Sequence, residues 1–445
     1  MTSSLSLRPS REPFGAEDLR DCWPALDIDE RIEGFRVLER DEAAEFFQSL
    51  DSLAQVRLLE GLPMSERQLW LRVLAPDDAA DLLQRVPIEQ RDGWLDLLDA
   101  PTRHEVSALL AYAEDAAGGL MSPRFARVRP DMRVDEAIRY LQRQALGGLE
   151  TIYYAYTLDA EQRLLGVCSF RELFVAQPDK RVREVMKAEP IAVREDLDQE
   201  AVAQLFHQHG FLALPVVDAE GHMKGIVTID DVVGVVQEEA TEDAQKFGGM
   251  EALDAPYLET GFFHIIRKRA GWLAILFVGE MLTASAMGHF EDEIARAVVL
   301  AVFIPLIISS GGNSGSQAST LIIRAMALGE VRLRDWWKII RRELAAGLML
   351  GVILGSIGMV RILTWQLLFS TYGNHYALVA MTVGLSLVGV VTWGTLSGSM
   401  LPFVLRGLKL DPASASAPFV ATLVDVSGLV IYFSVAKVVL GGSLL

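Results

Sequence analysis

Residues 297–325 read AVVLAVFIPLIISSGGNSGSQASTLIIRA, and this stretch decides the class of the protein. It is apolar at both ends and long enough to cross a bilayer, for which about 20 residues suffice. Its centre, residues 309–320, consists instead of small and polar residues. Two interpretations fit that centre equally well: a face on which helices pack closely, or polar backbone that lines protein or water at membrane depth. A phosphate-binding loop is disfavoured, because no Lys closes the pattern and no strand is expected before it.

Five stretches of the chain, this one included, are apolar enough to span a membrane. Lys and Arg cluster before the first, between the second and third, and between the fourth and fifth, whereas the intervening loops share a single Arg. Because positive loops stay in the cytoplasm, the pattern predicts a multi-pass protein of the plasma (inner) membrane with cytoplasmic N-terminal domains and an extracytoplasmic C-terminus. The five stretches are residues 272–290, 297–325, 344–369, 378–405 and 419–440.

The net charge of −18 is unevenly distributed. Residues 261–445 contain 14 basic and 9 acidic residues, whereas residues 1–260 contain 27 basic and 50 acidic ones. So acidic a chain repels phosphate backbones, and we expect no nucleic-acid partner. The 2 Cys exclude a disulfide-stapled scaffold. The sequence holds neither a nucleophile–base arrangement nor an HExxH spacing, so it predicts no enzyme.

Two acids interrupt the apolar stretches. Asp425 lies in the last one, where a carboxylate costs about 2.5–3.5 kcal/mol on insertion scales, so we expect it to face an ion, a wet cavity or a partner. The alternative is a protonated Asp bonded to a neighbouring helix. Glu280 in the first stretch raises the same question, with pore-lining and structural roles evenly weighted. Arg361 in the third is expected to snorkel outward.

Residues from about 30 to 113 show helical periodicity with short connectors, which predicts a small superhelix of antiparallel helices. Acids dominate its exposed positions. Asp77 and Asp81 are four residues apart and therefore share one helix face. Such a pair is either a solvated surface or, more specifically, part of a site for a hard cation that takes oxygen ligands.

Residues 118–239 contain an internal repeat in which each unit reads helix, strand, strand, helix. The repeat resembles a tandem pair of CBS domains, a regulatory module whose clefts bind adenine nucleotides or ions. Gly225, Thr228 and Asp231 resemble its ribose- and phosphate-binding turn, and Glu172 stands at the equivalent place in the first unit. This resemblance implies ATP as a regulatory ligand, although many such units are structural spacers.

The whole order, from about residue 29 to the end, resembles the MgtE family of magnesium channels. The most specific motifs are the segment from Pro305 to Arg324 and the segment from Asp411 to Asp425. The resemblance implies a homodimeric, Mg²⁺-selective channel in which Asp425 holds a hydrated ion beside Asn313, Gly312 and Gly428. It also implies that cytosolic Mg²⁺ binds the acidic domains and holds the pore shut.

The expected fold class is multi-domain: a superhelical α-helical N-domain, tandem α/β CBS domains, a connecting plug helix and a five-helix α transmembrane domain. The expected boundaries are residues 1–28 for a disordered or N-terminal extension, 29–117 for the acidic helical N-domain, 118–181 for the first CBS domain, 182–235 for the second CBS domain, 236–260 for the plug helix and 261–445 for the transmembrane pore domain.

The resemblance also assigns cytosolic Mg²⁺ ligands one by one. This sequence has Gly210 and Gly234 at two positions where the family pattern suggests acids. The Mg²⁺ sensor is therefore expected to hold fewer ions or to respond at higher Mg²⁺ concentration. The implied ligands are Asp77, Asp81, Glu200, Asp231, Glu239, Glu242 and Asp243.

Two other functions remain open on the residues alone. One is a divalent-cation exchanger coupled to Na⁺ or H⁺, for which Glu280 would be the proton-binding acid. The other is a nucleotide-sensing membrane scaffold that conducts nothing. Flux into liposomes separates the three, because a scaffold passes no Mg²⁺, an exchanger requires an opposing ion gradient, and a channel responds to voltage alone.

Overall fold

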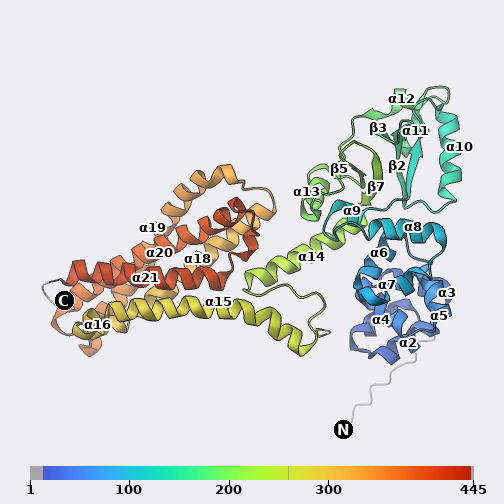
Figure 1. The fold of residues 1–445 in the computed structure, drawn as a ribbon. Helices are drawn as coiled ribbons and strands as arrows, with labels where there is room; N and C mark the ends of the chain where they lie inside the picture. Colours follow the sequence, from blue (N-terminus) through green and yellow to red (C-terminus); the bar gives the residue numbers. More distant parts are fainter. Residues whose placement is uncertain (1–13, 259, 442–445) are drawn as a thin grey trace, which may run out of the picture. The chain divides into compact units, whose positions relative to one another are not determined.

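The structure, a computed structural model, describes residues 14–258 and 260–441 (Figure 1). It divides into two compact units, Met1–Val236 and Gln237–Leu445. Helix α14 (Ile229–Phe247) begins in the first unit and ends in the second. The first unit holds the short helices and the strands, and the second holds the long apolar helices.

The N-terminal part of the first unit is the predicted superhelix of short helices. Aspartates begin several of them: the side chains of Asp51 and Asp99 accept hydrogen bonds from the N–H groups of Ala54 and Thr102 at 2.8 and 2.9 Å. Apolar residues at helical spacing then fill the core. The helices are α1 (Ala16–Cys22), α2 (Ile28–Val37), α3 (Arg40–Gln48), α4 (Ser52–Glu60), α5 (Met64–Leu71), α6 (Pro76–Arg85), α7 (Ile88–Leu95) and α8 (Ala100–Leu109).

The expected N-terminal extension needs a correction. Its residues 1–13 lie outside the described residues, but residues 14–28 belong to the helical domain. Leu19 on α1 is fully buried, and the Trp23 ring packs edge-on against Phe46 with 5.0 Å between centroids. Burial of these apolar side chains makes this segment part of the core of the helical domain.

The predicted repeat is confirmed as two α/β units. The first has a four-stranded sheet in the order β1-β2-β3-β4, and the second a three-stranded sheet in the order β5-β6-β7. In each, the first strand pairs in parallel and the rest are antiparallel. The strands are β1 (Phe125–Val128), β2 (Thr151–Leu158), β3 (Leu164–Ser169), β4 (Lys187–Ala188), β5 (Val193–Arg194), β6 (Ala213–Val217) and β7 (Met223–Thr228), and the helices are α9 (Ala117–Leu120), α10 (Val134–Ala145), α11 (Phe170–Val175), α12 (Val182–Val185) and α13 (Gln199–His209).

The same turn closes the hairpin of each unit. Asp159 and Asp218 start the two turns, and each carboxylate accepts a hydrogen bond from the N–H four residues on, at 2.7 and 2.8 Å. The fourth position is left-handed in both, with φ of 65° at Gln162 and 86° at Gly221. The Gly221 carbonyl accepts the Leu164 N–H at 3.1 Å, so the two hairpins join the CBS units into a pair.

The helical domain and the second CBS unit share one hydrophobic core. Leu82 of α6 and Val106 of α8 belong to the same buried cluster as Val202 of α13 and Val232 of α14. Backbone bonds tie the junction, with the Ala117 N–H donating to the Leu197 carbonyl at 2.7 Å. This packing brings the N-terminal end of α14 to the helical domain.

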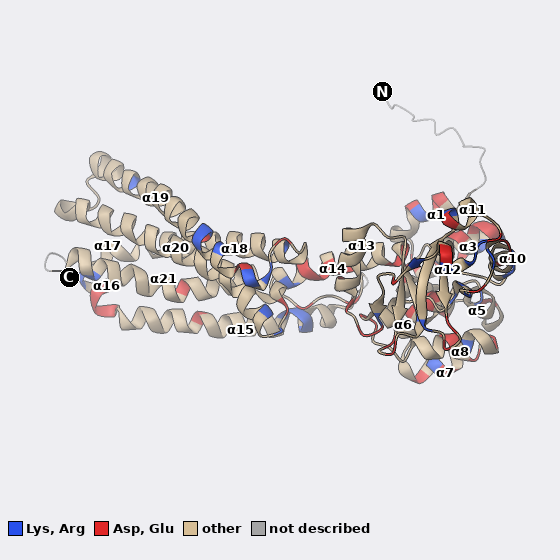
Figure 2. Ribbon diagram, turned by 90° about the horizontal axis from the view of Figure 1, so that it is seen from above, with Lys and Arg blue, Asp and Glu red and all other residues tan. Residues whose placement is uncertain are grey.

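The second unit contains the five predicted membrane spans. Within residues 14–258 and 260–441, five helices are long and apolar enough to cross a membrane. Figure 2 shows that Lys, Arg, Asp and Glu gather toward the helix ends and are sparse along their middles. The long helices are α15 (Phe262–His289), α18 (Ile304–Ala327), α19 (Trp336–Phe369), α20 (Tyr376–Gly407) and α21 (Ala417–Leu440), with short α16 (Glu291–Arg296) and α17 (Val298–Ala301) between the first two.

The small-residue centre, residues 309–320, lies within the continuous helix α18, and its buried glycines and serines occupy one face of that helix. Gly311 and Gly315 are buried against Gly394 and Gly398 of α20, at backbone distances that admit no side chain. The hydroxyls of Ser314 and Thr395 share a buried hydrogen bond of 2.7 Å. This face is therefore a close helix-packing face, one of the two interpretations that the spacing allowed.

Candidate functional site

Carboxylates from three separate segments of the first unit gather beside the N-terminal end of α14. Helix α6 supplies three of these carboxylates, the residue before β2 supplies one, and the start of α14 supplies two. Each is close enough to others of the group for electrostatic repulsion between them. We call these residues the acidic cluster: Asp77, Asp78, Asp81, Glu150, Asp230 and Asp231.

Burial makes this cluster electrostatically unfavourable. Desolvation, together with repulsion from neighbouring carboxylates, raises the pKa of Asp81 to about 8 and that of Asp231 to about 7. The same two causes raise the pKa of Asp77 well above its usual range. Charged carboxylates in this place therefore need a proton or a cation.

Basic side chains compensate this charge only weakly in the part of the chain that the structure describes. Within the described residues, no Lys or Arg forms an ion pair with a member of the acidic cluster. Arg85 and Arg124, whose charges act on Asp81 and Glu150, form their ion pairs with other acids: Arg85 with Glu114 at 2.7 Å and Arg124 with Glu105 at 2.8 Å. The Oδ1 atom of Asp77 is buried and has no hydrogen-bond partner in the part of the chain that the structure describes. Oxygen ligands in this number suit Mg²⁺ or Ca²⁺.

The sequence predicted part of this cluster. Asp77, Asp81 and Asp231 were expected as ligands, and the structure brings the three together. Asp78 and Asp230 were missed, although each directly adjoins a predicted ligand. Glu150 was missed because it reaches the cluster through the fold, and its recorded hydrogen bond comes from the Ser122 hydroxyl at 3.2 Å.

Glu200 lies in the first turn of α13. The Asp198 side chain caps this helix by accepting the Glu200 N–H at 2.9 Å. The Glu200 carboxylate accepts a hydrogen bond of 3.4 Å from the Gln204 side chain on the next turn. Its role as a ligand stays a prediction.

The acids at the C-terminal end of α14 have a different environment, within the second unit. Lys246 forms ion pairs with Glu242 and, at 2.6 Å, with Asp411 in the segment before α21. Burial and repulsion by Asp411 raise the pKa of Asp243. Glu239 lies one turn before Asp243 on the same helix. This group, unlike the acidic cluster, already contains a cation.

The nucleotide-like turn of the second CBS unit joins β7 to α14, and its role in nucleotide binding stays a prediction. The Thr228 hydroxyl donates to the Asp231 carboxylate at 2.6 Å. A side chain at Gly225 would lie 2.6 Å from the Ser122 carbonyl, so only Gly fits there. Asp231 thus belongs both to this turn and to the acidic cluster.

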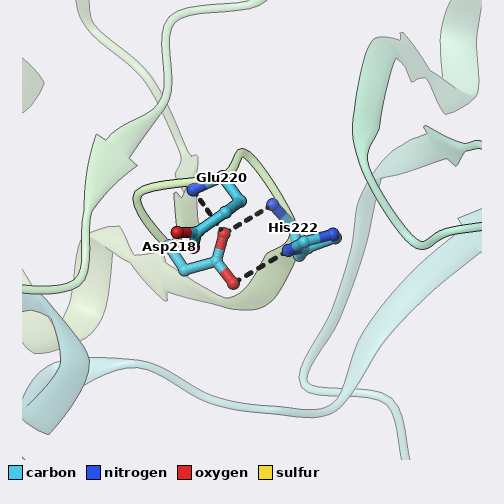
Figure 3. Close-up of side chains that lie close together, drawn as sticks. All are labelled: Asp218, Glu220 and His222. Carbon is cyan, nitrogen blue, oxygen red and sulfur yellow. Dashed lines mark hydrogen bonds and ion pairs between the residues drawn. The ribbon is translucent and has the colours of Figure 1, made fainter.

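A third group of possible ligands lies in the hairpin between β6 and β7. Asp218, Glu220 and His222 place one ligand atom each within 4.8 Å of one another. Figure 3 shows that Asp218 is already occupied: it accepts the backbone N–H groups of Glu220 and His222 and contacts the His222 ring at 3.0 Å. Lys224 also pairs with it at 3.1 Å, and these partners hold the Asp218 pKa below its usual range. The group is a turn rather than a metal site.

In the second unit, Asp425 lies on α21 between two other helices. A Cβ atom at Gly312 of α18 would stand 3.8 Å from its Oδ1, and Glu280 of α15 lies within hydrogen-bonding reach of its carboxyl group. Asn313 is exposed on α18. Gly428 is buried where α21 contacts α20, and a Cβ atom added to it would lie 3.1 Å from the Val390 side chain.

An acidic helical domain, a CBS pair and five membrane helices, two of which carry an acid within their apolar stretch, together define an integral membrane transport protein. The family models agree: "Divalent cation transporter" matches residues 304–435, "MgtE intracellular N domain" residues 15–115 and "CBS domain" residues 182–238. The magnesium transporter MgtE of Thermus thermophilus is 42% identical over 98% of this chain and 95% of its own length. The chain belongs to the MgtE family of magnesium transporters.

Other relatives extend this comparison. The magnesium transporter MgtE of Bacillus subtilis is 31% identical over 89% of this chain and 85% of its own length. Among solved structures, the cytosolic domain of the Mg²⁺ channel MgtE in complex with ATP is 44% identical and covers 50% of this chain and 90% of that one, with a TM-score of 0.47.

Proposed function

We propose that the chain is a homodimeric, Mg²⁺-selective channel that imports magnesium across the plasma (inner) membrane, with its N-terminal domains in the cytoplasm and its C-terminus outside. Asp425 holds the hydrated ion. Mg²⁺ gives up its water reluctantly, so a site that offers one or two carboxylates beside small residues suits it. The position of Asp425 beside Gly312 supports this role, and two copies on a dimer axis would supply two carboxylates.

The same proposal makes the acidic cluster the sensor that closes the channel when cytosolic Mg²⁺ rises. The observation that carries it is the Oδ1 atom of Asp77, which has no hydrogen-bond partner among the described residues and is buried among carboxylates that form no ion pair with a described Lys or Arg. Mg²⁺ stabilises the arrangement that holds α6 against the start of α14, and only such a difference in affinity can shift a gating equilibrium. Glu200, Glu239, Glu242 and Asp243 are further proposed ligands.

Flux into liposomes that contain the full-length protein tests both parts. We expect Asp425→Asn to abolish voltage-driven Mg²⁺ entry while the protein elutes at its normal size. We expect Asp77→Asn with Asp81→Asn to leave entry intact but to weaken closure by Mg²⁺ on the cytoplasmic side. Asp96→Asn, an exposed acid of the same domain, is the control. Normal entry through Asp425→Asn excludes Asp425 from the ion path, and normal closure of the double variant excludes the sensor.

An ion-coupled exchanger on the same fold is the second candidate. The observation that favours it is the contact of Glu280 with Asp425, which places a second carboxyl group beside the proposed ion. An exchanger would take up Mg²⁺ only when an opposing gradient of Na⁺ or H⁺ drives the exchange, and Glu280→Gln would remove the dependence on that gradient. Entry driven by voltage alone, unchanged by either gradient, supports the channel.

ATP is a proposed regulatory ligand at the turn of Gly225, Thr228 and Asp231. Because Asp231 also belongs to the acidic cluster, nucleotide and Mg²⁺ would influence one another through it. A protein that binds ATP but passes no Mg²⁺ under any gradient would instead be a nucleotide-sensing, non-conducting scaffold. No enzymatic activity is proposed.

A further inference from the structure

Helix α19 carries two Arg–Trp pairs, one toward each end, that the proposed ion path does not use. The Arg341 guanidinium lies over the Trp337 ring, 5.0 Å from its centroid, and the Arg361 guanidinium lies over Trp365 at 5.1 Å. In each pair the Trp is one turn farther from the middle of α19 than its Arg. Both guanidinium groups therefore reach away from the middle of the helix.

The distance between the two pairs matches a bilayer. Arg341 and Arg361 are 20 positions apart, which is about 30 Å along an α-helix. The hydrocarbon core of a typical bilayer is also about 30 Å thick. Residues 344–360, between them, carry no charged side chain. When α19 spans a membrane, each pair thus lies at the depth of one headgroup layer, where Trp and Arg are favoured.

Both pairs are accessible and short of anionic partners. Helix α19 buries a stripe of glycines against α20, whereas Trp337 and Trp365 are 48% and 41% exposed. Within residues 14–258 and 260–441, no carboxylate forms an ion pair with either Arg. Arg361 donates one hydrogen bond, to the Tyr372 hydroxyl at 3.2 Å. Most of the five N–H donors of each guanidinium remain available.

We propose that each Arg–Trp pair binds the phosphate of a membrane phospholipid, one in each leaflet. A planar guanidinium donates to two phosphate oxygens at once, and stacking on the indole ring fixes its orientation. Arg334 and Arg342 are exposed beside Arg341, so this site favours an anionic headgroup. The inference does not depend on the proposed ion path, because neither pair includes a residue of that path.

Native mass spectrometry of the full-length protein tests the proposal by counting retained lipid. The probes are phosphatidylglycerol, phosphatidylcholine, diacylglycerol, which lacks the phosphate, and inorganic phosphate. We expect both phospholipids to be retained over diacylglycerol, and about fivefold weaker retention in Arg361→Gln and in Arg341→Gln. Arg361→Lys should recover only part of the loss, since it keeps the charge but not the planar donor geometry. Arg406→Gln is the control, because Arg406 is exposed on α20 and its guanidinium lies over no aromatic ring among the described residues.

Several results would overturn the proposal. Retention by the two Gln variants equal to that of the unchanged protein would exclude the sites. If Arg406→Gln loses as much lipid retention as the two Gln variants, the loss comes from a general change in charge and not from the Arg–Trp pairs. Displacement of the lipids by millimolar inorganic phosphate would mean a site for the free anion, and no retention in the unchanged protein would mean that a second copy of the chain covers this face. Thermal unfolding in diacylglycerol shows separately whether each variant is folded.

Discussion

The Gly311 carbonyl oxygen of α18 lies so near Gly394 of α20 that a Cβ atom at Gly394 would stand 2.3 Å from it. Gly315 and Gly398 repeat the relationship one turn on, at 2.0 Å. In a bilayer, close van der Waals packing of this kind replaces the hydrophobic effect as the force that holds helices together. The α18–α20 contact therefore positions α18, and with it Gly312 beside Asp425.

We expect Gly394→Ala to separate these helices and to destabilise the membrane unit by about 1–3 kcal/mol or more, because the obstacle is backbone and cannot rotate away. Thermal unfolding of the full-length protein in detergent measures this. Gly271→Ala on α15 is the matched control, since nothing lies within 4 Å of its added methyl group. Equal unfolding temperatures for the two variants would contradict the packing.

The sequence could predict those members of the proposed sensor that are close to one another along the chain, but not those that only the tertiary structure brings together. The four-residue spacing of Asp77 and Asp81 predicted a shared helix face, because helical periodicity is local. Glu150 could not be predicted, since it joins the cluster only after the sheet of the first CBS unit has formed and the helical domain has packed on the second. Such pairing depends on tertiary contacts that no short window of sequence contains.

The membrane unit shows the same division. Length and hydropathy predicted all five spans, because the bilayer imposes a simple requirement on each helix separately. The role of residues 309–320 stayed undecided until the partner was known, as small residues suit both a helix contact and a polar lining. Lys246 went unnoticed at the sequence level because its partner Asp411 lies 165 residues away.

The hairpin of the second CBS unit gives a test of backbone conformation alone. Gly221 has φ of 86° and nothing within 4 Å of an added Cβ, so Gly221→Ala changes only the conformational cost. We expect Gly221→Ala to destabilise the compact unit Met1–Val236, which contains this hairpin, by about 1–2 kcal/mol. Gly234→Ala, at a helical position equally free of neighbours, should stabilise by up to about 1 kcal/mol. Thermal unfolding should give shifts of opposite sign, and two shifts of the same sign would contradict this prediction.

The acidic cluster predicts how stability depends on pH without divalent cations. Two of its carboxyl groups have raised pKa values in the folded state, about 8 for Asp81 and about 7 for Asp231. The folded form therefore keeps protons that the unfolded chain releases at about pH 4, so stability falls as the pH rises from about 4 to about 8. Mg²⁺ should offset the fall, because it replaces those protons.

Thermal unfolding of the full-length protein in EDTA and in Mg²⁺, across this pH range, measures the effect. Asp81→Asn should flatten the curve in EDTA and reduce the stabilisation by Mg²⁺. The exposed Asp96→Asn should leave both unchanged. A curve for the unchanged protein that is flat, or that rises with pH in EDTA, would show that the cluster is not buried as the structure has it.

The Lys246–Asp411 ion pair joins the end of α14 to the segment that begins α21, the helix of Asp425. Phe247, the next residue, packs with Ile323, Ala413 and Ala415, so charge and apolar contact act at one junction. We expect Lys246→Asp to weaken this junction, because it places a fourth carboxylate beside Glu242, Asp243 and Asp411. The partial exposure of the pair limits the direct loss to about 1 kcal/mol.

The charge swap decides whether the pair matters for gating. If the proposed closure by Mg²⁺ holds, Lys246→Asp alone should shift the Mg²⁺ concentration that halves Mg²⁺ entry into liposomes, and Lys246→Asp with Asp411→Lys should restore it. The swap keeps one attraction between the same two positions, so restoration cannot come from a general change in charge. The opposite outcome is a shift in the double variant that equals the sum of the shifts in Lys246→Asp and Asp411→Lys measured singly. In that case the pair carries no coupling between α14 and α21, and the apolar contacts of Phe247 alone hold the junction.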